Sequence, residues 1–249
     1  MKETEMIFGT RAVIEAIQAG KDVDKILMRK DLQNDLAREL FAAIKATNIP
    51  LQRVPQVKLD SLTRKNHQGV IAFISAVTYQ RLEDIVPTFF EQGKTPFIVL
   101  LDGITDVRNF GAIARTCSCA GVDAIVIPSR NSVSVSADAV KTSAGALLSI
   151  PVCRESSIVE AVRFLKNSGY CVTAATEKAE KSYTSIDYTL PTAIVLGGED
   201  MGISTDTLRI CDELVKIPVL GNIASLNVSA AAAVLAYEVV RARNLSNLN

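Results

Sequence analysis

The segment IPVLGNIASLNVSAAAAVLAYEVV, residues 217–240, joins two kinds of structure without a break. Its apolar start resembles the end of a β-strand, and its last part, rich in Ala, Val and Leu, predicts a buried helix. The loop between them carries Ser225, Leu226 and Asn227. Polar residues between two apolar elements indicate a place where a small ligand could meet backbone amides. The alternative is that Ser225 or Asn227 simply caps the helix.

Two similar junctions lie upstream. NFGAIAR, residues 109–115, follows an apolar run and opens a predicted helix for which Asn109 is a suitable N-cap. LGGEDMG, residues 196–202, ends another apolar run, and its paired glycines would let a ligand approach the backbone closely. Read from the residues alone, the alternatives are a capped helix with Arg115 on the surface and a tight turn with Glu199 in solvent.

The composition predicts a soluble globular protein with one large or two small domains. Of its 249 residues, 48% are hydrophobic and 22% are charged, with 27 basic and 27 acidic side chains. A net charge of zero neither supports nor excludes a nucleic-acid partner. Because aromatics make up only 5% and Trp is absent, base stacking cannot be extensive. The N-terminus does not resemble a signal peptide, and no apolar run approaches the ~20 residues that span a bilayer. We therefore expect a cytoplasmic protein with no membrane contact.

The cysteines and the single histidine argue against a metal site. No two of the five cysteines form a C-x-x-C pair, so zinc ligation of the usual kind is not expected. The cysteines lie mostly in apolar runs, as reduced thiols that pack like small hydrophobes do. His67 lies far in sequence from the three polar segments, and we interpret it as a structural loop residue rather than a catalytic base.

The order of apolar runs predicts an α/β protein. From Phe97 onwards, short runs rich in β-branched residues alternate with helical segments, which is typical of a parallel sheet covered on both faces. Residues 1–76 form a smaller predicted α/β unit with amphipathic helices. Residues 77–94 are expected to be a linker with one amphipathic helix, which Pro87 either interrupts or precedes, and residues 95–249 to be the main domain. The six predicted strands of that domain are FIVLLDG, AIVIP, LLSIPVC, CVTAAT, AIVLGG and LVKIPV.

The three polar segments, taken in order, resemble motifs 1, 2 and 3 of the SpoU family of RNA ribose 2′-O-methyltransferases, within the SPOUT superfamily. Asn109 and Arg115 match motif 1. Motif 2 is matched by Gly197, Glu199 and Gly202, although Asp200 stands where many members have Gly. The N-terminal segments IFGTRAVIEAI and NHQGVIAFI resemble the small L30e-like RNA-binding domain that precedes the SpoU domain in ribosomal RNA guanosine-2′-O-methyltransferases.

This resemblance implies a C-terminal α/β domain with a deep trefoil knot, preceded by an L30e-like α/β domain. It also implies a homodimer in which the last helix lies near the interface. The cofactor would be S-adenosylmethionine. Ile217, Leu226 and the amides around them would hold its adenosyl part opposite Gly197, with Gly198 and Gly202 in the same motif 2 loop.

The implied chemistry is an in-line displacement that needs alignment and removal of a proton. In the family, the motif 1 arginine is proposed to activate the hydroxyl, but a guanidinium is a reluctant base. We expect Arg115 instead to bind the neighbouring phosphate and to stabilise the developing alkoxide. Asn109, Glu199, Ser225 and Asn227 complete the predicted catalytic set, and no metal is required.

The resemblance favours ribosomal RNA as substrate, with a guanosine of 23S rRNA as the leading target, and transfer RNA as an alternative. A non-catalytic RNA-binding assembly factor would keep the fold without the chemistry. Loss of Arg115, Glu199 or Asn227 would favour this alternative, but all three residues are present. A nicotinamide-dependent oxidoreductase would show a glycine fingerprint after its first strand, which this chain does not. The predicted phosphate contacts are Arg11, Lys21, Lys25, Arg29, Lys30, Arg64 and Lys65.

Overall fold

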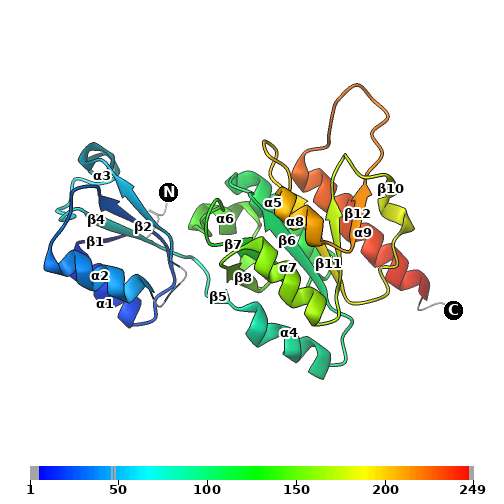
Figure 1. The fold of residues 1–249 in the computed structure, drawn as a ribbon, viewed down its shortest axis with the longest axis horizontal. Helices are drawn as coiled ribbons and strands as arrows, with labels where there is room; N and C mark the ends of the chain where they lie inside the picture. The colour runs from blue at the N-terminus through cyan, green and yellow to red at the C-terminus, as the bar shows by residue number, and fades with distance from the viewer. Residues whose placement is uncertain (1–5, 46, 48, 247–249) are drawn as a thin grey trace. The chain divides into compact units, whose positions relative to one another are not determined.

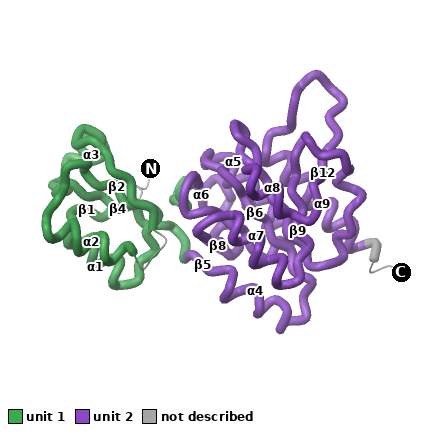
Figure 2. Tube along the Cα trace, viewed as in Figure 1, with its two compact units in different colours: residues 1–78, 134–138 green, residues 79–133, 139–249 purple. Residues whose placement is uncertain are grey.

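The computed structural model describes residues 6–45, 47 and 49–246. These residues form two compact units, drawn in different colours in Figure 2. The first comprises the residues up to 78 together with 134–138, and the second the remaining residues from 79 onwards. Each unit has its own sheet.

The first unit is a mixed four-stranded sheet with helices on both faces (Figure 1). Its elements are β1 (Met6–Phe8), α1 (Thr10–Gln18), β2 (Val23–Arg29), α2 (Asp35–Lys45), β3 (Leu51–Val54), α3 (Gln56–Leu62) and β4 (Val70–Ile74). In the strand order β1-β4-β2-β3, only the pair β2–β3 is parallel.

Alternation along the strands explains why this unit has helices on both faces. Ile26 of β2 packs with α1 and α2, whereas its neighbour Leu27 packs with Leu59 of α3. Successive side chains of a strand point to opposite faces, so each face needs its own cover. The predicted α/β unit at the N-terminus is confirmed.

The second unit is an eight-stranded sheet. Its strands are β5 (Tyr79–Gln80), β6 (Phe97–Asp102), β7 (Ala124–Pro128), β8 (Val152–Glu155), β9 (Cys171–Ala175), β10 (Lys181–Ser182), β11 (Thr192–Gly197) and β12 (Glu213–Lys216). They follow the order β10-β12-β9-β11-β6-β7-β8-β5, and every neighbouring pair is parallel. The central strands are buried along nearly their whole length, as the continuous apolar runs predict.

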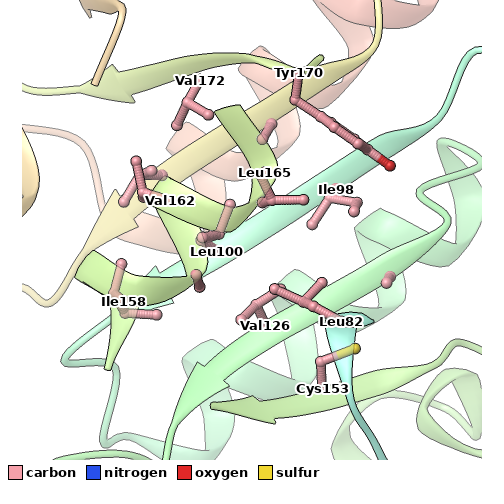
Figure 3. Close-up of a cluster of buried hydrophobic side chains, with 14 of the residues drawn as sticks. Leu82, Ile98, Leu100, Val126, Cys153, Ile158, Val162, Leu165, Tyr170 and Val172 are labelled. Atoms are coloured by element: carbon pink, nitrogen blue, oxygen red, sulfur yellow. The ribbon is translucent and has the colours of Figure 1, made fainter. Parts of the chain in front are cut away.

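Helices cover both faces of this sheet (Figure 1). The helices after β5 are α4 (Leu82–Glu91), α5 (Val107–Cys119), α6 (Ala137–Thr142), α7 (Ile158–Asn167), α8 (Thr205–Ile210) and α9 (Val228–Ser246), with short 3₁₀ helices at Ala146–Leu148 and Tyr183–Ser185. The helices α4, α7 and α8 share one core with the strands, part of which Figure 3 shows. On the opposite face, α5 and α9 pack against each other, and α9 also contacts β11.

The segment expected to be a linker is part of the second unit. Within residues 77–94, β5 pairs with β8, and α4 buries Leu82, Val86 and Phe89 in the core. Pro87 lies inside α4 rather than before it. The segment differs from the expectation because an amphipathic helix needs an apolar surface to cover its own apolar stripe, and the sheet provides one.

The strand order creates a crevice between β6 and β11. From β6 the chain continues to β7 on one side, whereas from β11 it continues through α8 to β12 on the other side. Ligands of parallel α/β sheets bind at such a reversal, beyond the carboxyl ends of the strands. The fold therefore directs attention to the residues after Asp102 and Gly197. Among the described helices, none is long and apolar enough to cross a membrane.

Candidate active site

A cavity of about 800 Å³ lies at the carboxyl ends of β6, β7, β8 and β11. Its volume is within the ~300–1,000 Å³ of typical small-molecule sites. It is lined by Asp102, Gly103, Ile104, Thr105, Asp106, Asn109, Pro128, Arg130, Asn131, Ser156, Ser157, Ile158, Val159, Thr207, Val228 and the segment 198–205. The cavity thus stands where the strand order predicts a ligand.

Three side chains from the three predicted motifs meet beside this cavity, whose lining includes Asn109 and Glu199. Asn109 Nδ2 donates to Glu199 Oε1 at 3.1 Å, and Asn227 Nδ2 donates to Asn109 Oδ1 at 3.0 Å. Asn227 Nδ2 also donates to Glu199 Oε1. One carboxylate oxygen thus joins the starts of α5 and α9 to the loop after β11. We call this trio the Asn–Glu–Asn cluster.

The start of α5 differs from the sequence prediction. Asp106, not Asn109, is the N-cap, and its carboxylate accepts hydrogen bonds from the backbone N–H groups of Arg108 and Asn109 at 2.8 and 2.9 Å. A carboxylate is a strong cap because it satisfies two free N–H groups beside the positive end of the helix dipole. Asn109 then lies within the first turn, where its side chain is available to Glu199.

Asn227 caps α9, as the sequence alternative predicts, and also belongs to the Asn–Glu–Asn cluster. Its Oδ1 accepts from the backbone N–H of Ser229 at 2.9 Å and from the Ser229 hydroxyl at 2.6 Å, as a helix cap does. Its Nδ2 faces the other way and completes the Asn–Glu–Asn cluster. Capping fixes the Asn227 side chain, so the helix start also orients the amide toward Glu199.

The glycines of motif 2 serve the fold of their own loop. A Cβ on Gly197 would lie 2.2 Å from the carbonyl carbon of Gly202, and a Cβ on Gly198 would lie 2.5 Å from the carbonyl oxygen of Gly103. The loop turns back on itself through a bond from Gly202 N to Gly198 O at 2.8 Å. We expected a ligand to need the space at Gly197, but in the structure backbone atoms of the loop fill it. Gly198 and Gly202 do line the cavity.

Asp102 anchors this loop to the end of β6. Its carbonyl accepts from Gly198 N at 2.9 Å, and its carboxylate accepts from Ser204 N at 3.0 Å. Both ends of the loop are therefore tied to one residue, which holds Glu199 over the crevice.

Six of the predicted site residues lie outside the cavity lining. They are Gly197, Arg115, Ile217, Ser225, Leu226 and Asn227, and Asn227 contacts two residues that do line it. Arg115 is exposed on α5, and no hydrogen bond or ion pair joins its side chain to another described residue. The loop between β12 and α9 is also exposed, with Leu226 at 43% and Leu220 at 99%. The catalytic role of Arg115 and Ser225 and the cofactor contacts of Ile217 and Leu226 stay predictions.

Other residues of the cavity were missed. Arg130 and Asn131 follow β7, and Ser156 and Ser157 follow β8. The signal that could have found them is the one used for the three motifs, namely polar residues directly after a buried strand. Their segments carry no glycine pair and no family pattern, so that signal alone was weak.

Three of the five cysteines are poor nucleophiles and metal ligands. Burial raises the pKa of the Cys117, Cys153 and Cys211 thiols to about 12, so these groups are protonated at neutral pH. Cys119 differs from the expectation of a core residue, because it is exposed. Among residues 6–45, 47 and 49–246, no group of three or more His, Cys, Asp or Glu side chains is placed to hold a metal ion.

Two family models account for most of the chain. Residues 96–237 match the SpoU rRNA Methylase family, and residues 6–80 match the RNA 2′-O ribose methyltransferase substrate binding domain. The chain belongs to the SpoU family. It is therefore an RNA 2′-O-ribose methyltransferase, and the motif resemblance seen in the sequence is confirmed.

Relatives of the same length support this assignment. The chain is 35% identical to a putative TrmH family tRNA/rRNA methyltransferase of Staphylococcus saprophyticus, over 97% of each chain. It is 33% identical to the putative TrmH family tRNA/rRNA methyltransferase YacO of Bacillus subtilis, over 98% of each.

Solved structures share the fold. The SpoU methyltransferase AviRb of Streptomyces viridochromogenes, crystallised with the cofactor AdoMet, matches with a TM-score of 0.61 and 25% identity, over 96% of this chain and 90% of that one. The AdoMet-bound rRNA methyltransferase of Sinorhizobium meliloti matches with a TM-score of 0.61 and 25% identity, over 95% and 86%. The α/β class with its parallel sheet is confirmed, and the knot itself stays a prediction.

The fit around Gly197 yields a prediction. Gly197→Ala should lower the free energy of unfolding by about 3 kcal/mol, because the new methyl group would displace the backbone that holds Glu199. Gly202→Ala is the matched control: no atom lies within 4 Å of its added Cβ, and its φ of +65° should cost about 1 kcal/mol. Urea unfolding of both variants measures the difference, and equal losses would contradict this account of the loop.

Proposed function

We propose that this protein transfers the methyl group of S-adenosylmethionine to the ribose 2′-hydroxyl of a guanosine in 23S rRNA, in the cytoplasm. The Asn–Glu–Asn cluster beside the cavity is the observation that carries the proposal. The choice of a 23S guanosine depends on the resemblance of the N-terminal segments to the rRNA guanosine enzymes. Transfer RNA is the second candidate, since relatives are named tRNA/rRNA methyltransferases.

The residues at the cavity fit S-adenosylmethionine, which carries charges of both signs and an apolar ring system. Asp102 and Asp106 place carboxylates there for the positive groups, and Arg130 places a guanidinium for the carboxylate. Ile104 and Ile158 supply apolar surface. The bound cofactor supplies an electrophilic methyl group on a sulfonium.

The Asn–Glu–Asn cluster is suited to hold the ribose. Glu199 Oε1 accepts from both amides, which leaves Oε2 without a partner among the described residues. Oε2 can therefore accept the proton of a ribose hydroxyl while Oε1 stays fixed. Because Asn109 and Asn227 belong to different helices, the carboxylate is braced from two directions, and the hydroxyl oxygen is oriented before the reaction.

Arg115 is proposed to act on the RNA rather than on the cluster. It is exposed and unpaired among the described residues, so its guanidinium is available to a phosphate beside the target ribose. A cation there would stabilise the alkoxide that develops as the proton leaves.

Methyl transfer measured with radiolabelled cofactor tests this proposal. The wild-type chain should methylate unmodified 23S rRNA transcript, and ribose mapping by mass spectrometry should find one 2′-O-methylguanosine. Arg115→Ala should lower turnover by ~10²–10³ while cofactor affinity measured by calorimetry stays the same. Arg163→Ala, which removes an exposed arginine paired only with Glu160, is the control.

Methylation of tRNA transcript in place of 23S rRNA would favour the second candidate. Cofactor binding without methyl transfer to either RNA would refute the proposed function. Near-wild-type turnover of Arg115→Ala would remove Arg115 from the mechanism.

We propose further that the protein is a homodimer built on the outward face of α9. The inward stripe of this helix, which includes Ala232 and Ala236 at 3% and 2% exposure, is covered by its own chain. The outward stripe contains Ala230, Ala233 and Tyr237, which recur at helical spacing. Small residues next to an exposed tyrosine suit close approach of a second helix.

Tyr237→Glu should therefore convert the protein into a monomer while the subunit stays folded, because Tyr237 is 51% exposed in one chain. Sedimentation at micromolar concentration should give twice the 26.8 kDa of the single chain for the wild type and for the control Leu190→Glu. A monomeric wild type would refute the dimer. A dimeric Tyr237→Glu variant would place the interface elsewhere.

A further inference from the structure

The turn before β4, residues 66–69, is built around a buried histidine. His67 Nδ1 accepts from the backbone N–H of Gly69 at 3.0 Å. Its Nε2 therefore carries the proton and donates to Asp60 Oδ1 of α3 at 2.9 Å. These bonds join the turn to α3, so His67 is structural, as its sequence position predicts.

The turn holds Gln68 in an unusual backbone conformation. Its φ is +50°, in the left-handed region that residues with a side chain rarely adopt. The next residue, Gly69, has φ +84°, and its carbonyl accepts from Arg29 N at 2.8 Å. Strain of this kind is often found where a side chain must be aimed at a ligand. Here it leaves Gln68 exposed, with its side-chain oxygen next to Gly9.

A pocket of about 370 Å³ opens between this turn and α3. It is lined by Arg29, Gln56, Asp60, Lys65, Asn66 and the turn residues 67–69. The Asn66 carboxamide accepts only from Gln68 N, at 3.3 Å, and the Gln68 carboxamide has no partner among the described residues. Two carboxamides thus offer donors and acceptors to whatever enters the pocket.

Cations flank these carboxamides. Lys65 holds its Nζ over the ring of Phe8, 5.3 Å from the centroid, rather than in an ion pair. Arg29 reaches Gln56 with Nη1 at 3.4 Å while its Nε pairs with Asp31. Amide groups that can pair with a base edge, beside a cation that can bind a phosphate, match the chemistry of a nucleotide.

We propose that this pocket binds one unpaired nucleotide of the substrate RNA. Its base edge would lie on the carboxamides of Asn66 and Gln68, and its phosphate on Lys65. Proteins read RNA sequence mainly at unpaired bases, which can leave the stack and enter such pockets. This inference rests on the proposed function, since it takes the methylated RNA as the ligand, and it gives the first unit a sequence-reading role in addition to phosphate contacts.

Filter binding of the full-length protein to 23S rRNA transcript, over a range of salt concentrations, tests the pocket. The double variant Asn66→Ala, Gln68→Ala should raise Kd by ~10-fold or more and leave the slope of log Kd against log salt unchanged, because base contacts release no counterions. Lys65→Ala should raise Kd and reduce that slope by about one. Matched controls are Gln33→Ala and Lys45→Ala, which are exposed residues of the same unit outside the pocket.

Two results would overturn the inference. One is a double variant that binds the RNA with the same Kd as the wild type and has an unchanged thermal midpoint. The other is a weaker Kd accompanied by the same loss of slope as in Lys65→Ala, which would indicate phosphate contacts alone. A tRNA transcript assayed in parallel shows whether either RNA is read by the pocket.

Methyl transfer at saturating RNA separates this inference from the proposed function. If the wild type methylates RNA and the double variant binds it equally well, only the pocket assignment fails. If the wild type transfers no methyl group, the proposed function fails. The inference predicts that the double variant keeps its turnover at saturating RNA, because the pocket binds and does not react.

Discussion

The carboxylate of Glu199 joins segments that are far apart in the sequence. Its Oε1 receives the amides of Asn109, 90 residues earlier, and Asn227, 28 residues later. The loop that carries Glu199 must therefore be rigid, and it is tied at both ends to Asp102. The tight packing at Gly197 and the capping roles of Asp106 and Asn227 follow from the same need to fix these groups.

The sheet accounts for where this meeting takes place. Because β6 and β11 are neighbours, the end of β6 lies next to the loop that begins at Gly197 and Gly198. The register pairs Gly197 with Asp102, so the two loops start side by side. The short side chains of two asparagines and one glutamate can therefore form hydrogen bonds with one another across the crevice. The Asn–Glu–Asn cluster therefore lies at the carboxyl edge of the sheet, beside the cavity.

Much of this could be predicted from the sequence, because parallel strands buried on both faces leave continuous apolar runs such as AIVIP and AIVLGG. The sequence also predicts the motif residues Asn109, Glu199 and Asn227, and the structure brings their side chains together. The error at the start of α5 has a physical cause: Asp106 and Asn109 are both good caps, and the sequence does not reveal which of them the preceding loop delivers to the helix. The sequence also does not reveal why residue 197 must be a glycine, because the backbone atoms that exclude a Cβ there belong to Gly202 and Ile203 in the loop that follows.

Other features depend on tertiary structure alone. The pocket between α3 and the 66–69 turn needs the pairing of β4 with β2, which no local pattern reveals. The sequence predicts a linker with one amphipathic helix over residues 77–94, yet the sheet buries Leu82 and Val86 of α4. Conversely, the family resemblance places the last helix near a subunit interface, but packing within the chain already covers Ala232 of that helix.

We propose that Asn109, Glu199 and Asn227 act as one unit in catalysis, and a double-mutant cycle tests this most directly. Asn109 and Glu199 are suitable because neither is a helix N-cap. The measurement is kcat/KM for methyl transfer by Asn109→Ala, Glu199→Ala and the double variant, each checked for an unchanged thermal midpoint. The account predicts that each single change lowers kcat/KM by ~10²-fold and that the double variant is little worse, because residues that act together lose their effect together. Losses that multiply in the double variant, or a single variant with near-wild-type kcat/KM, would contradict it.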